Sequence, residues 1–377
     1  MGAGIYIHIP FCKQFCVYCD FYSISRAQYK RDFIEALIKE IYCKRDFFRE
    51  DNRVPTTIYF GGGTPSLLSL AELESITSAI RDCFSLNLEE ATIEVNPNDI
   101  SLEYAKGLKR LGFNRVSMGV QSFNDSHLKW MNRRHTVLEA VDSFNILRDV
   151  GFKNISIDLI YGYPILQSKE WIATIERAIE LNPNHISAYQ MTVERGTKLY
   201  KMIRDKELDS IDEDIAAEQF FILQERLNRA GYMMYEISNF ALGNNGEYES
   251  KHNNLYWARE PYLGLGPAAH SFKGDIRWAN ISNLTKYIDY FNNNRNVVIS
   301  TKECLTQDDI YNEIIMVGLR RAKGVKLNDI SNILTNKDKY NIDREIQLGN
   351  IIVDGEYIKI PSNKLFISDG IIVSLMR

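Results

Sequence analysis

Residues 5–19 read IYIHIPFCKQFCVYC, a short β-like run that leads directly into a loop with three cysteines. The run itself, residues 5–9, places an isoleucine at every second position, which is the spacing of a strand with one buried face. Cys12, Cys16 and Cys19 follow within eight residues. Barrel enzymes build their sites at the carboxyl ends of parallel strands, so this segment predicts both the first strand and the position of a site.

The strand-like pattern recurs along the chain, and helix-like sequence follows each run. Ser69 and Glu72 fit a capping box at the start of the helix after the second run. Alternating strands and helices predict a parallel sheet with helices outside it. Candidate functional residues recur at the strand ends, which favours a partial barrel over an open doubly wound sheet. The further runs span residues 57–60, 91–95, 115–119, 155–160, 185–191 and 232–237.

The composition is that of an ordinary soluble globular protein. The 377 residues amount to roughly two or three domains, and 45% of them are hydrophobic and 25% charged. Six cysteines are too few for a disulfide-stapled secreted scaffold, and the sequence shows neither a signal peptide nor an apolar run long enough to cross a membrane. We therefore expect a cytoplasmic protein, in whose reducing compartment clustered cysteines are ligands or redox centres rather than bridges.

We expect three parts along the chain: a barrel over residues 1–240, a connecting segment over 241–304 and a small C-terminal domain over 305–377. The connecting segment is rich in Asn, Gly and aromatic residues. Such a composition predicts loop with short elements.

The C-terminal part combines helix-like sequence at residues 310–322 and 327–334 with a hairpin-like pair at 357–360 and 365–374. Helices followed by a β wing predict a small winged-helix-like α+β domain. Winged helices often bind DNA, but the ten basic residues of this part are balanced by ten acidic ones, and the whole chain has a net charge of −4. This balance is a poor match to a phosphate backbone, so we do not expect a nucleic-acid partner.

Three kinds of site are compatible with the cysteine loop. A redox pair of Cys16 and Cys19 leaves Cys12 without a role. A zinc site needs a fourth ligand, for which His8 or Asp20 is available. A [4Fe–4S] cluster on three thiolates leaves one iron open for a substrate or cofactor, and this interpretation uses all three cysteines.

Polar residues and glycines mark the ends of the later strands. Residues 61–65 read GGGTP, and consecutive glycines let backbone approach a ligand closely. Glu94, Gln121 and Asp158 end or follow the next three strands, and Arg133 comes twelve residues after Gln121. Each could be a satisfied polar group or a surface charge. Together they direct acceptors and a cation toward one mouth, as recognition of an amino acid joined to a nucleoside requires.

The cysteine spacing, in a loop after the first strand, resembles the radical S-adenosylmethionine (radical SAM) superfamily, in which the open iron chelates the methionine part of S-adenosylmethionine. The segments YIHIPFC (6–12), EVNP (94–97), GVQSF (119–123) and IDLIYG (157–162), with the glycine turn, resemble the oxygen-independent coproporphyrinogen III oxidase family over nearly the full chain. The resemblance implies a partial (β/α)6 barrel with a small C-terminal domain. It also implies that Cys12, Cys16 and Cys19 hold a [4Fe–4S] cluster and that S-adenosylmethionine is contacted by Tyr6, Tyr18, Gly62, Gly63, Thr64, Glu94, Gln121, Arg133 and Asp158.

Two departures from the oxidase pattern point to a subgroup of that family. The oxidase has a fourth cysteine two places after the third, where this chain has Phe21, and a longer segment ahead of the cluster, where this chain has eleven residues before Cys12. In both features the chain resembles the HemW subgroup of heme chaperones. Residues 252–257 read HNNLYW and match the His-Asn-x-x-Tyr-Trp motif of that subgroup.

The motif suits a porphyrin, because imidazole is a common axial ligand of heme iron and aromatic rings can cover the macrocycle. The resemblance implies that His252, Tyr256 and Trp257 bind heme. The alternative is that His252 is only a loop histidine among asparagines. His270 is a weaker candidate for a second ligand.

The leading hypothesis is a heme chaperone that passes heme to an acceptor protein, which the sequence does not identify and which could be membrane-associated. We do not expect coproporphyrinogen III oxidase activity. An oxygen-independent coproporphyrinogen III oxidase is the alternative hypothesis to the heme chaperone. A third hypothesis is a zinc-stabilised interaction protein that uses neither iron nor S-adenosylmethionine.

Overall fold

A computed structural model describes residues 2–49, 51–293 and 299–377. Its main sheet has, within these residues, twelve strands in the order β12-β11-β10-β9-β1-β2-β3-β4-β5-β6-β8-β7. Neighbouring strands from β1 to β6 are all parallel, which confirms the expected partial (β/α)6 barrel. These six strands are β1 (Gly2–Ile9), β2 (Val54–Gly62), β3 (Glu90–Val95), β4 (Arg115–Gln121), β5 (Asn154–Tyr161) and β6 (His185–Gln190).

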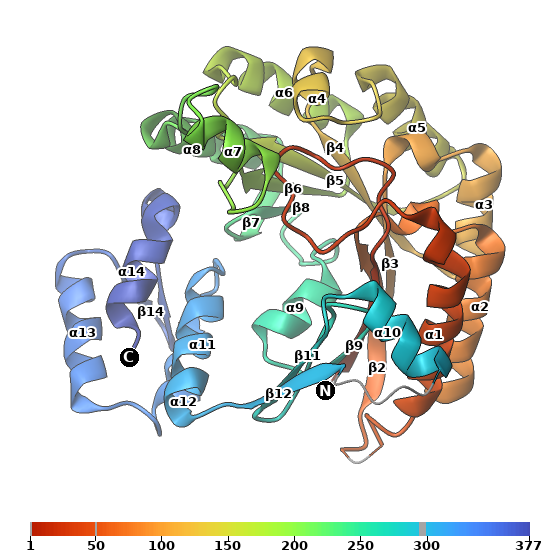
Figure 1. Ribbon diagram of the computed structural model, residues 1–377. Helices are drawn as coiled ribbons and strands as arrows, with labels where there is room; N and C mark the ends of the chain where they lie inside the picture. The colour runs from red at the N-terminus through yellow and green to blue at the C-terminus, as the bar shows by residue number, and fades with distance from the viewer. Residues whose placement is uncertain (1, 50, 294–298) are drawn as a thin grey trace.

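Helices run along the outer face of these strands (Figure 1). The isoleucines at positions 5, 7 and 9 of β1 are fully buried and belong to the same core as Phe33 and Leu37 of the first helix. The predicted capping box is confirmed: the Glu72 amide donates to Ser69 Oγ, and the Ser69 amide donates to Glu72 Oε2. The helices are α1 (Lys30–Cys43), α2 (Leu70–Cys83), α3 (Leu102–Arg110), α4 (Asp125–Trp130), α5 (Val137–Asp149), α6 (Ser168–Leu181), α7 (Lys198–Arg204) and α8 (Glu213–Arg229).

The segment after residue 240 carries more regular structure than the expected loop with short elements. Its strand β9 (Tyr262–Leu265) pairs in parallel with β1, and β10 (His270–Lys273), β11 (Ile276–Asn280) and β12 (Ser300–Cys304) continue the sheet in antiparallel fashion. Residues 294–298 lie outside the described residues. The antiparallel pair β7 (Tyr232–Glu236) and β8 (Asn239–Leu242) ends the other side of the sheet, and α10 (Leu284–Asn293) packs on α1.

The short helix α9 (Lys251–Trp257) lies at the amino ends of the first strands. Its His252 side chain contacts Thr57 at the start of β2, and a Cβ added at Gly4 of β1 would lie 3.0 Å from the His252 ring. Glu90, the first residue of β3, accepts hydrogen bonds from the Lys251 and His252 amides. Helix α9 therefore closes the floor of the barrel, opposite the carboxyl ends of the strands.

The C-terminal part has the element order expected of a winged-helix-like domain. Its elements are α11 (Gln307–Leu319), β13 (Val325–Lys326), α12 (Leu327–Ile330), α13 (Asn336–Gln347), β14 (Ile352–Asp354), β15 (Tyr357–Lys359) and α14 (Ser368–Leu375). The three strands form a second sheet in the order β13-β15-β14. Figure 1 shows this domain beside the barrel.

The predicted hairpin between 357–360 and 365–374 is wrong. The hairpin partner of β15 is β14, on the other side of Gly355, and β13 pairs with the other edge of β15. Residues 362–375 form a 3-10 helix followed by α14. Ile371, Ile372 and Leu375 are buried while Val373 is 67% exposed, which is a helical pattern of burial. A short apolar run does not distinguish a strand from a buried helix by periodicity, and here packing against α11 and α13 favours the helix.

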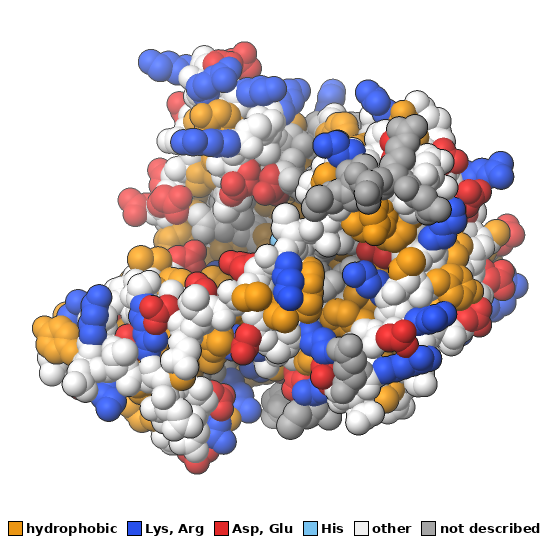
Figure 2. All heavy atoms as spheres, turned by 60° about the horizontal axis from the view of Figure 1, so that its bottom comes forward, with side chains coloured by type: hydrophobic (Ala, Val, Ile, Leu, Met, Phe, Trp, Pro, Cys, Tyr) orange, Lys and Arg blue, Asp and Glu red, His pale blue; other side chains and the backbone are white. Residues whose placement is uncertain are grey.

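Charges of both signs are interspersed on the face shown in Figure 2. None of the described helices combines the length and the apolar character that a bilayer span requires.

Candidate functional site

A cavity of about 680 Å³ opens at the carboxyl ends of β2 to β6, beneath the cysteine loop. Eleven of the residues predicted from sequence line this one cavity: Cys12, Cys16, Tyr18, Cys19, Gly62, Gly63, Thr64, Glu94, Gln121, Arg133 and Asp158. They come from four strands and from loops that lie far apart in the sequence. The fold therefore brings together side chains that the sequence could place only at separate strand ends.

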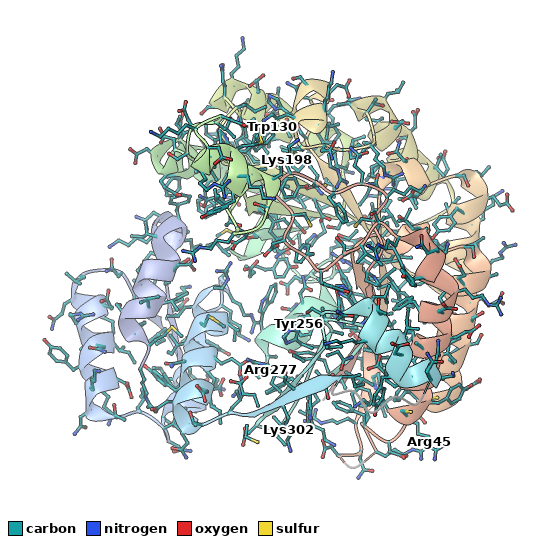
Figure 3. All side chains as sticks on the ribbon, in the orientation of Figure 1. Arg45, Trp130, Lys198, Tyr256, Arg277 and Lys302 are labelled. Atoms are coloured by element: carbon teal, nitrogen blue, oxygen red, sulfur yellow. The ribbon has the colours of Figure 1, made fainter. Side chains whose placement is uncertain are left out.

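The cysteine loop is held over the cavity by backbone hydrogen bonds. The Cys12 amide donates to the Ile24 carbonyl over 2.9 Å, and the Leu199 amide donates to the Val17 carbonyl over 2.8 Å. Figure 3 shows Lys198, the first residue of α7, beside this loop. These contacts fix the loop at both ends, so the three thiols keep their place at the cavity wall.

The three cysteines are free thiols that are partly exposed. Arg133 Nη1 donates to Cys16 Sγ over 3.3 Å, and Cys12 Sγ lies 3.5 Å from Thr64 Oγ1. Burial raises the pKa of Cys19 to about 11, helped by the neighbouring thiols. Bound iron would supply the positive charge that stabilises the thiolates, so cluster binding is expected to release protons. Among the described residues, no group of three or more His, Cys, Asp or Glu side chains is arranged to hold a single metal ion.

The glycine turn after β2 leaves backbone at the cavity surface. A Cβ added at Gly63 would lie 2.7 Å from the Phe11 carbonyl oxygen and 2.9 Å from that of Ile9. Gly62 has a φ of +105°, and a Cβ there would meet the His8 ring at 2.6 Å. Both positions therefore require glycine, the first for close packing against backbone and the second for conformation as well.

Two carboxylates face the cavity from neighbouring parts of the sheet. Tyr59 donates to Glu94 Oε1 over 2.8 Å, and Ser117 donates to Asp158 Oδ1 over 3.1 Å. Burial is the main cause that raises the pKa of Glu94 to about 7 and that of Asp158 to about 6. Near neutral pH these groups are poised between their two forms, and a ligand that presents a cation or hydroxyl donors favours the ionised form.

Arg133 and Gln121 also line the cavity. The Arg133 guanidinium is partly buried and donates from Nη2 to the Gly119 carbonyl, while its Nε has no hydrogen-bond partner among the described residues. Gln121 ends β4 with a φ of +68°, a strained conformation for a non-glycine residue. A guanidinium with one unpartnered N–H, a glycine cradle and three thiols form a donor set that fits a cluster with an amino-acid nucleoside beside it.

Tyr6 does not line the cavity. Its ring lies one layer deeper, stacked on Tyr59 at 6.1 Å between centroids, and its hydroxyl is 3.2 Å from His8 Nδ1. Sequence reasoning missed Tyr59, which does line the cavity. The available signal was its position two residues before Gly61, because alternate residues of a strand face the same side.

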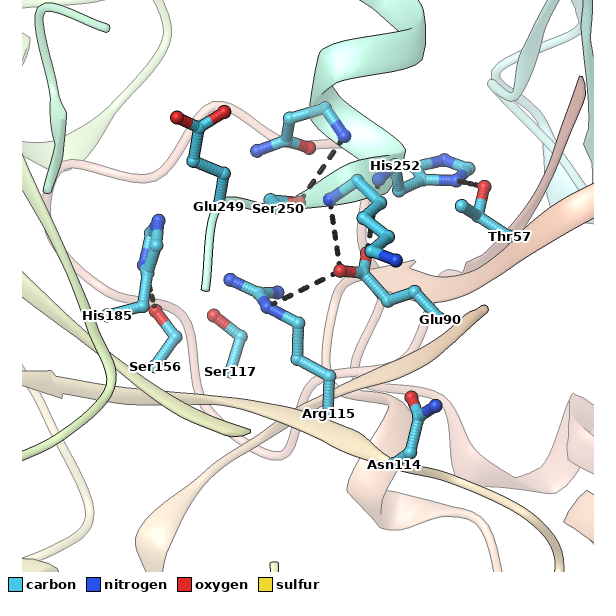
Figure 4. Close-up of polar contacts among 12 residues, drawn as sticks. Thr57, Glu90, Asn114, Arg115, Ser117, Ser156, His185, Glu249, Ser250 and His252 are labelled. Carbon is cyan, nitrogen blue, oxygen red and sulfur yellow. Dashed lines mark hydrogen bonds and ion pairs between the residues drawn. The ribbon is translucent and has the colours of Figure 1, made fainter. Parts of the chain in front are cut away.

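The HNNLYW motif lies on α9, away from the cysteine loop (Figure 3, where Tyr256 is labelled). His252 is 1% exposed, and both ring nitrogens are engaged: Nδ1 with Thr57 Oγ1 at 2.7 Å and Nε2 with the Tyr256 hydroxyl at 2.8 Å. Burial lowers the pKa of His252 to about 3, so the ring is neutral. Trp257 packs edge-on against Tyr235. His252 is thus a buried floor residue rather than a loop histidine (Figure 4).

Comparisons with known proteins agree with this fold. The profile of the radical SAM superfamily matches residues 6–178. A crystal structure described as "Coproporphyrinogen III oxidase (HemN) from Escherichia coli is a Radical SAM enzyme" superposes with a TM-score of 0.84 at 25% identity, over 100% of this chain and 90% of that one. The barrel and its cavity are therefore those of a radical SAM scaffold.

Sequence relatives define the family more narrowly. "Heme chaperone HemW" of Lactococcus lactis subsp. lactis is 36% identical over 329 residues, which cover 87% of this chain and 84% of the relative. "Heme chaperone HemW" of Bacillus subtilis is 36% identical over 85% of this chain and 84% of the relative. The chain belongs to the HemW family of radical SAM proteins.

Proposed function

We propose that this protein is a heme chaperone that binds heme and passes it to an acceptor protein. The observation that carries the proposal is the match to proteins named heme chaperones across more than four fifths of the chain. Phe21 supports it, because this exposed side chain at the cavity rim stands where the resemblance to the oxidase calls for a fourth cysteine. We further propose the cytoplasm as its compartment, where the six cysteines stay reduced.

The cofactor set follows from the residues that line the cavity. Cys12, Cys16 and Cys19 would hold one [4Fe–4S] cluster, which would supply an open iron for binding S-adenosylmethionine. The proposed contacts to S-adenosylmethionine are Tyr18, Gly62, Gly63, Thr64, Glu94, Gln121, Arg133 and Asp158, all of which line the cavity, and Tyr6, which supports it from one layer below. The carboxylates would accept from its amine and hydroxyl donors, and the glycine turn would offer backbone at close range.

Heme would engage the motif residues His252, Tyr256 and Trp257. Because both imidazole nitrogens are occupied, His252 becomes an iron ligand only after it releases Tyr256 or Thr57. Because the His252 ring is also only 1% exposed, heme binding at this site requires the barrel floor around α9 to open. The acceptor is a protein whose own heme site must compete with the bond between iron and His252.

The competing function is oxidative decarboxylation of coproporphyrinogen III, favoured by the structural likeness to the oxidase. Product analysis decides between the two functions. The reconstituted protein is incubated anaerobically with coproporphyrinogen III, S-adenosylmethionine and a reductant, and the tetrapyrroles are separated by chromatography. We expect unchanged coproporphyrinogen, whereas accumulation of protoporphyrinogen would return the protein to the oxidase class.

A further inference from the structure

Three aromatic rings connect the floor of the barrel to its cavity. His252 of α9 stacks on Tyr59 of β2 with centroids 5.2 Å apart and planes 27° apart. Tyr6 of β1 stacks against both, at 6.1 Å from Tyr59 and 6.4 Å from His252. The HNNLYW motif and the cavity therefore share a contact surface, and Asn253 of the motif lines the cavity directly.

At the cavity end of this stack, Tyr59 holds Glu94. The Tyr59 hydroxyl donates to Glu94 Oε1 over 2.8 Å, and both side chains line the cavity. Space around them is tight, since a Cβ added at Gly61 would lie 2.9 Å from the Tyr59 ring and 3.0 Å from the Glu94 carboxylate. A shift of the Tyr59 ring would therefore change the position of the Glu94 carboxylate.

At the floor, the His252 ring is fixed by hydrogen bonds and by packing. Thr57 and Tyr256 occupy its two nitrogens, and β1 approaches its edge at Gly4. The helix that carries it is anchored by Glu90, which is buried beside Arg115 and accepts from two α9 amides (Figure 4). Freeing a nitrogen of His252 for iron breaks one of these hydrogen bonds, and because the ring is only 1% exposed, bringing it into contact with heme draws it out of the stack.

We propose that His252 is a positioning residue for the S-adenosylmethionine pocket: it supports Tyr59 and, through Tyr59, sets the Glu94 carboxylate. The inference rests on the proposed function, because it takes Glu94 as a contact to S-adenosylmethionine and His252 as the heme ligand. His252 cannot hold heme iron and support Tyr59 at the same time. Heme at the motif and S-adenosylmethionine in the cavity therefore oppose each other, and by linkage each weakens the other by the same factor.

The first test measures the Kd of S-adenosylmethionine by anaerobic calorimetry on the cluster-reconstituted full chain. His252→Ala removes the ring and should raise Kd about tenfold, and Tyr59→Phe should raise it several-fold by removing the bond to Glu94. His252→Phe restores a ring without nitrogens and should recover most of the wild-type affinity. His185→Ala is the matched control, because it removes another buried histidine, one bonded to Ser156 and Tyr235 instead.

Wild-type Kd values in both His252→Ala and Tyr59→Phe would overturn the positioning role. An equal loss in His185→Ala would do so too, since it would mean general loosening of the barrel. If His252→Ala does not fold, the two variants that keep an aromatic ring decide the outcome. Tyr59→Phe removes only the hydroxyl of residue 59, and His252→Phe removes only the ring nitrogens of residue 252.

The second test repeats the titration after saturation with heme. The Kd of S-adenosylmethionine should rise in wild type and stay constant in His252→Phe, which has no ligand to offer. Heme that binds without changing this Kd would overturn the opposition and leave the chaperone function standing. Absence of saturable heme binding would instead refute the proposed function, while the first test still decides the role of His252.

Discussion

Glu94 is a carboxyl group whose environment opposes its own ionisation. Its pKa is about 7 in the folded protein, against an ordinary value of 4.5, and burial is the largest cause. Between these two values the folded state keeps a proton that the unfolded state has released. Stability contributed by this group is therefore present below pH 4.5 and is lost as the pH rises through 7. The proposed contact to S-adenosylmethionine would use the ionised form, which accepts hydrogen bonds through both oxygens.

This linkage predicts the behaviour of Glu94→Gln, which cannot ionise but keeps an acceptor for Tyr59. Between pH 5 and pH 8 the wild type should lose roughly 2 kcal/mol more unfolding free energy than the variant. Chemical denaturation of both proteins at the two pH values, without cofactor, measures the difference. Parallel pH profiles would mean that Glu94 titrates normally.

The cysteine assignments can be tested one residue at a time. Cys16→Ala should abolish the broad cluster absorption and bound iron after anaerobic reconstitution, because the three thiolates act together. Cys304→Ala, an exposed cysteine of β12, is the matched control and should retain both. Four irons retained in Cys16→Ala would contradict the assignment.

At the residue scale, the sequence predicted the cavity wall better than the barrel floor. Glu94 and Asp158 lie in the last part of strand-like runs, and the carboxyl ends of parallel strands meet at one edge, so their convergence was predictable. Tyr59 lies within such a run, and the sequence alone does not distinguish an inward-facing aromatic residue of the site from one of the hydrophobic core. The burial of His252 depends on contacts with Thr57 and Glu90, about 160 to 195 residues earlier, which no local pattern encodes.

Among the elements, the glycine turn after β2 is the one that tolerates least change. Gly63→Ala puts a methyl group against the backbone of the cysteine loop, where nothing flexible can yield. We expect a loss of about 1–3 kcal/mol in unfolding free energy and at least a tenfold weaker binding of S-adenosylmethionine. Thermal unfolding and calorimetry measure the two effects.

Gly370 of α14 is the matched control for this substitution. An added Cβ there meets nothing within 4 Å, and the residue is helical. Gly370→Ala should stabilise the protein slightly, by up to about 1 kcal/mol, and leave ligand binding unchanged. A Gly63→Ala variant that behaved like Gly370→Ala would contradict this prediction, because it would show that the glycine turn after β2 accommodates a methyl group.

The wing of the C-terminal domain shows where element prediction fails. Asp354-Gly355 is a strong hairpin signal, but the flanking strands of three residues each are too short for their alternation to stand out. The apolar run around Ile371 is longer than either of these strands, and its pattern predicts a strand. Packing against α11 and α13 makes it the helix α14 instead. Long periodic elements such as α2, with its capping box, were predicted correctly because their signals are local.

For the molecule as a whole, segments distant in sequence complete the cavity. Arg320, Phe366 and Asp369 of the C-terminal domain line it together with the barrel. Arg320 pairs with Asp369 and, across the domains, with Glu236 of β7. The same chain closes the barrel floor with α9, so the cofactor cavity and the HNNLYW motif are built into one continuous structure.

Heme binding by this chain is the central claim, and equilibrium titration of the full chain with heme tests it most directly. The Soret band should saturate at one heme per chain in wild type. His252→Ala should bind at least tenfold more weakly, because it loses the iron–imidazole bond, whereas Tyr256→Phe should change the affinity less. A wild-type Soret band that rises without saturation would contradict the account.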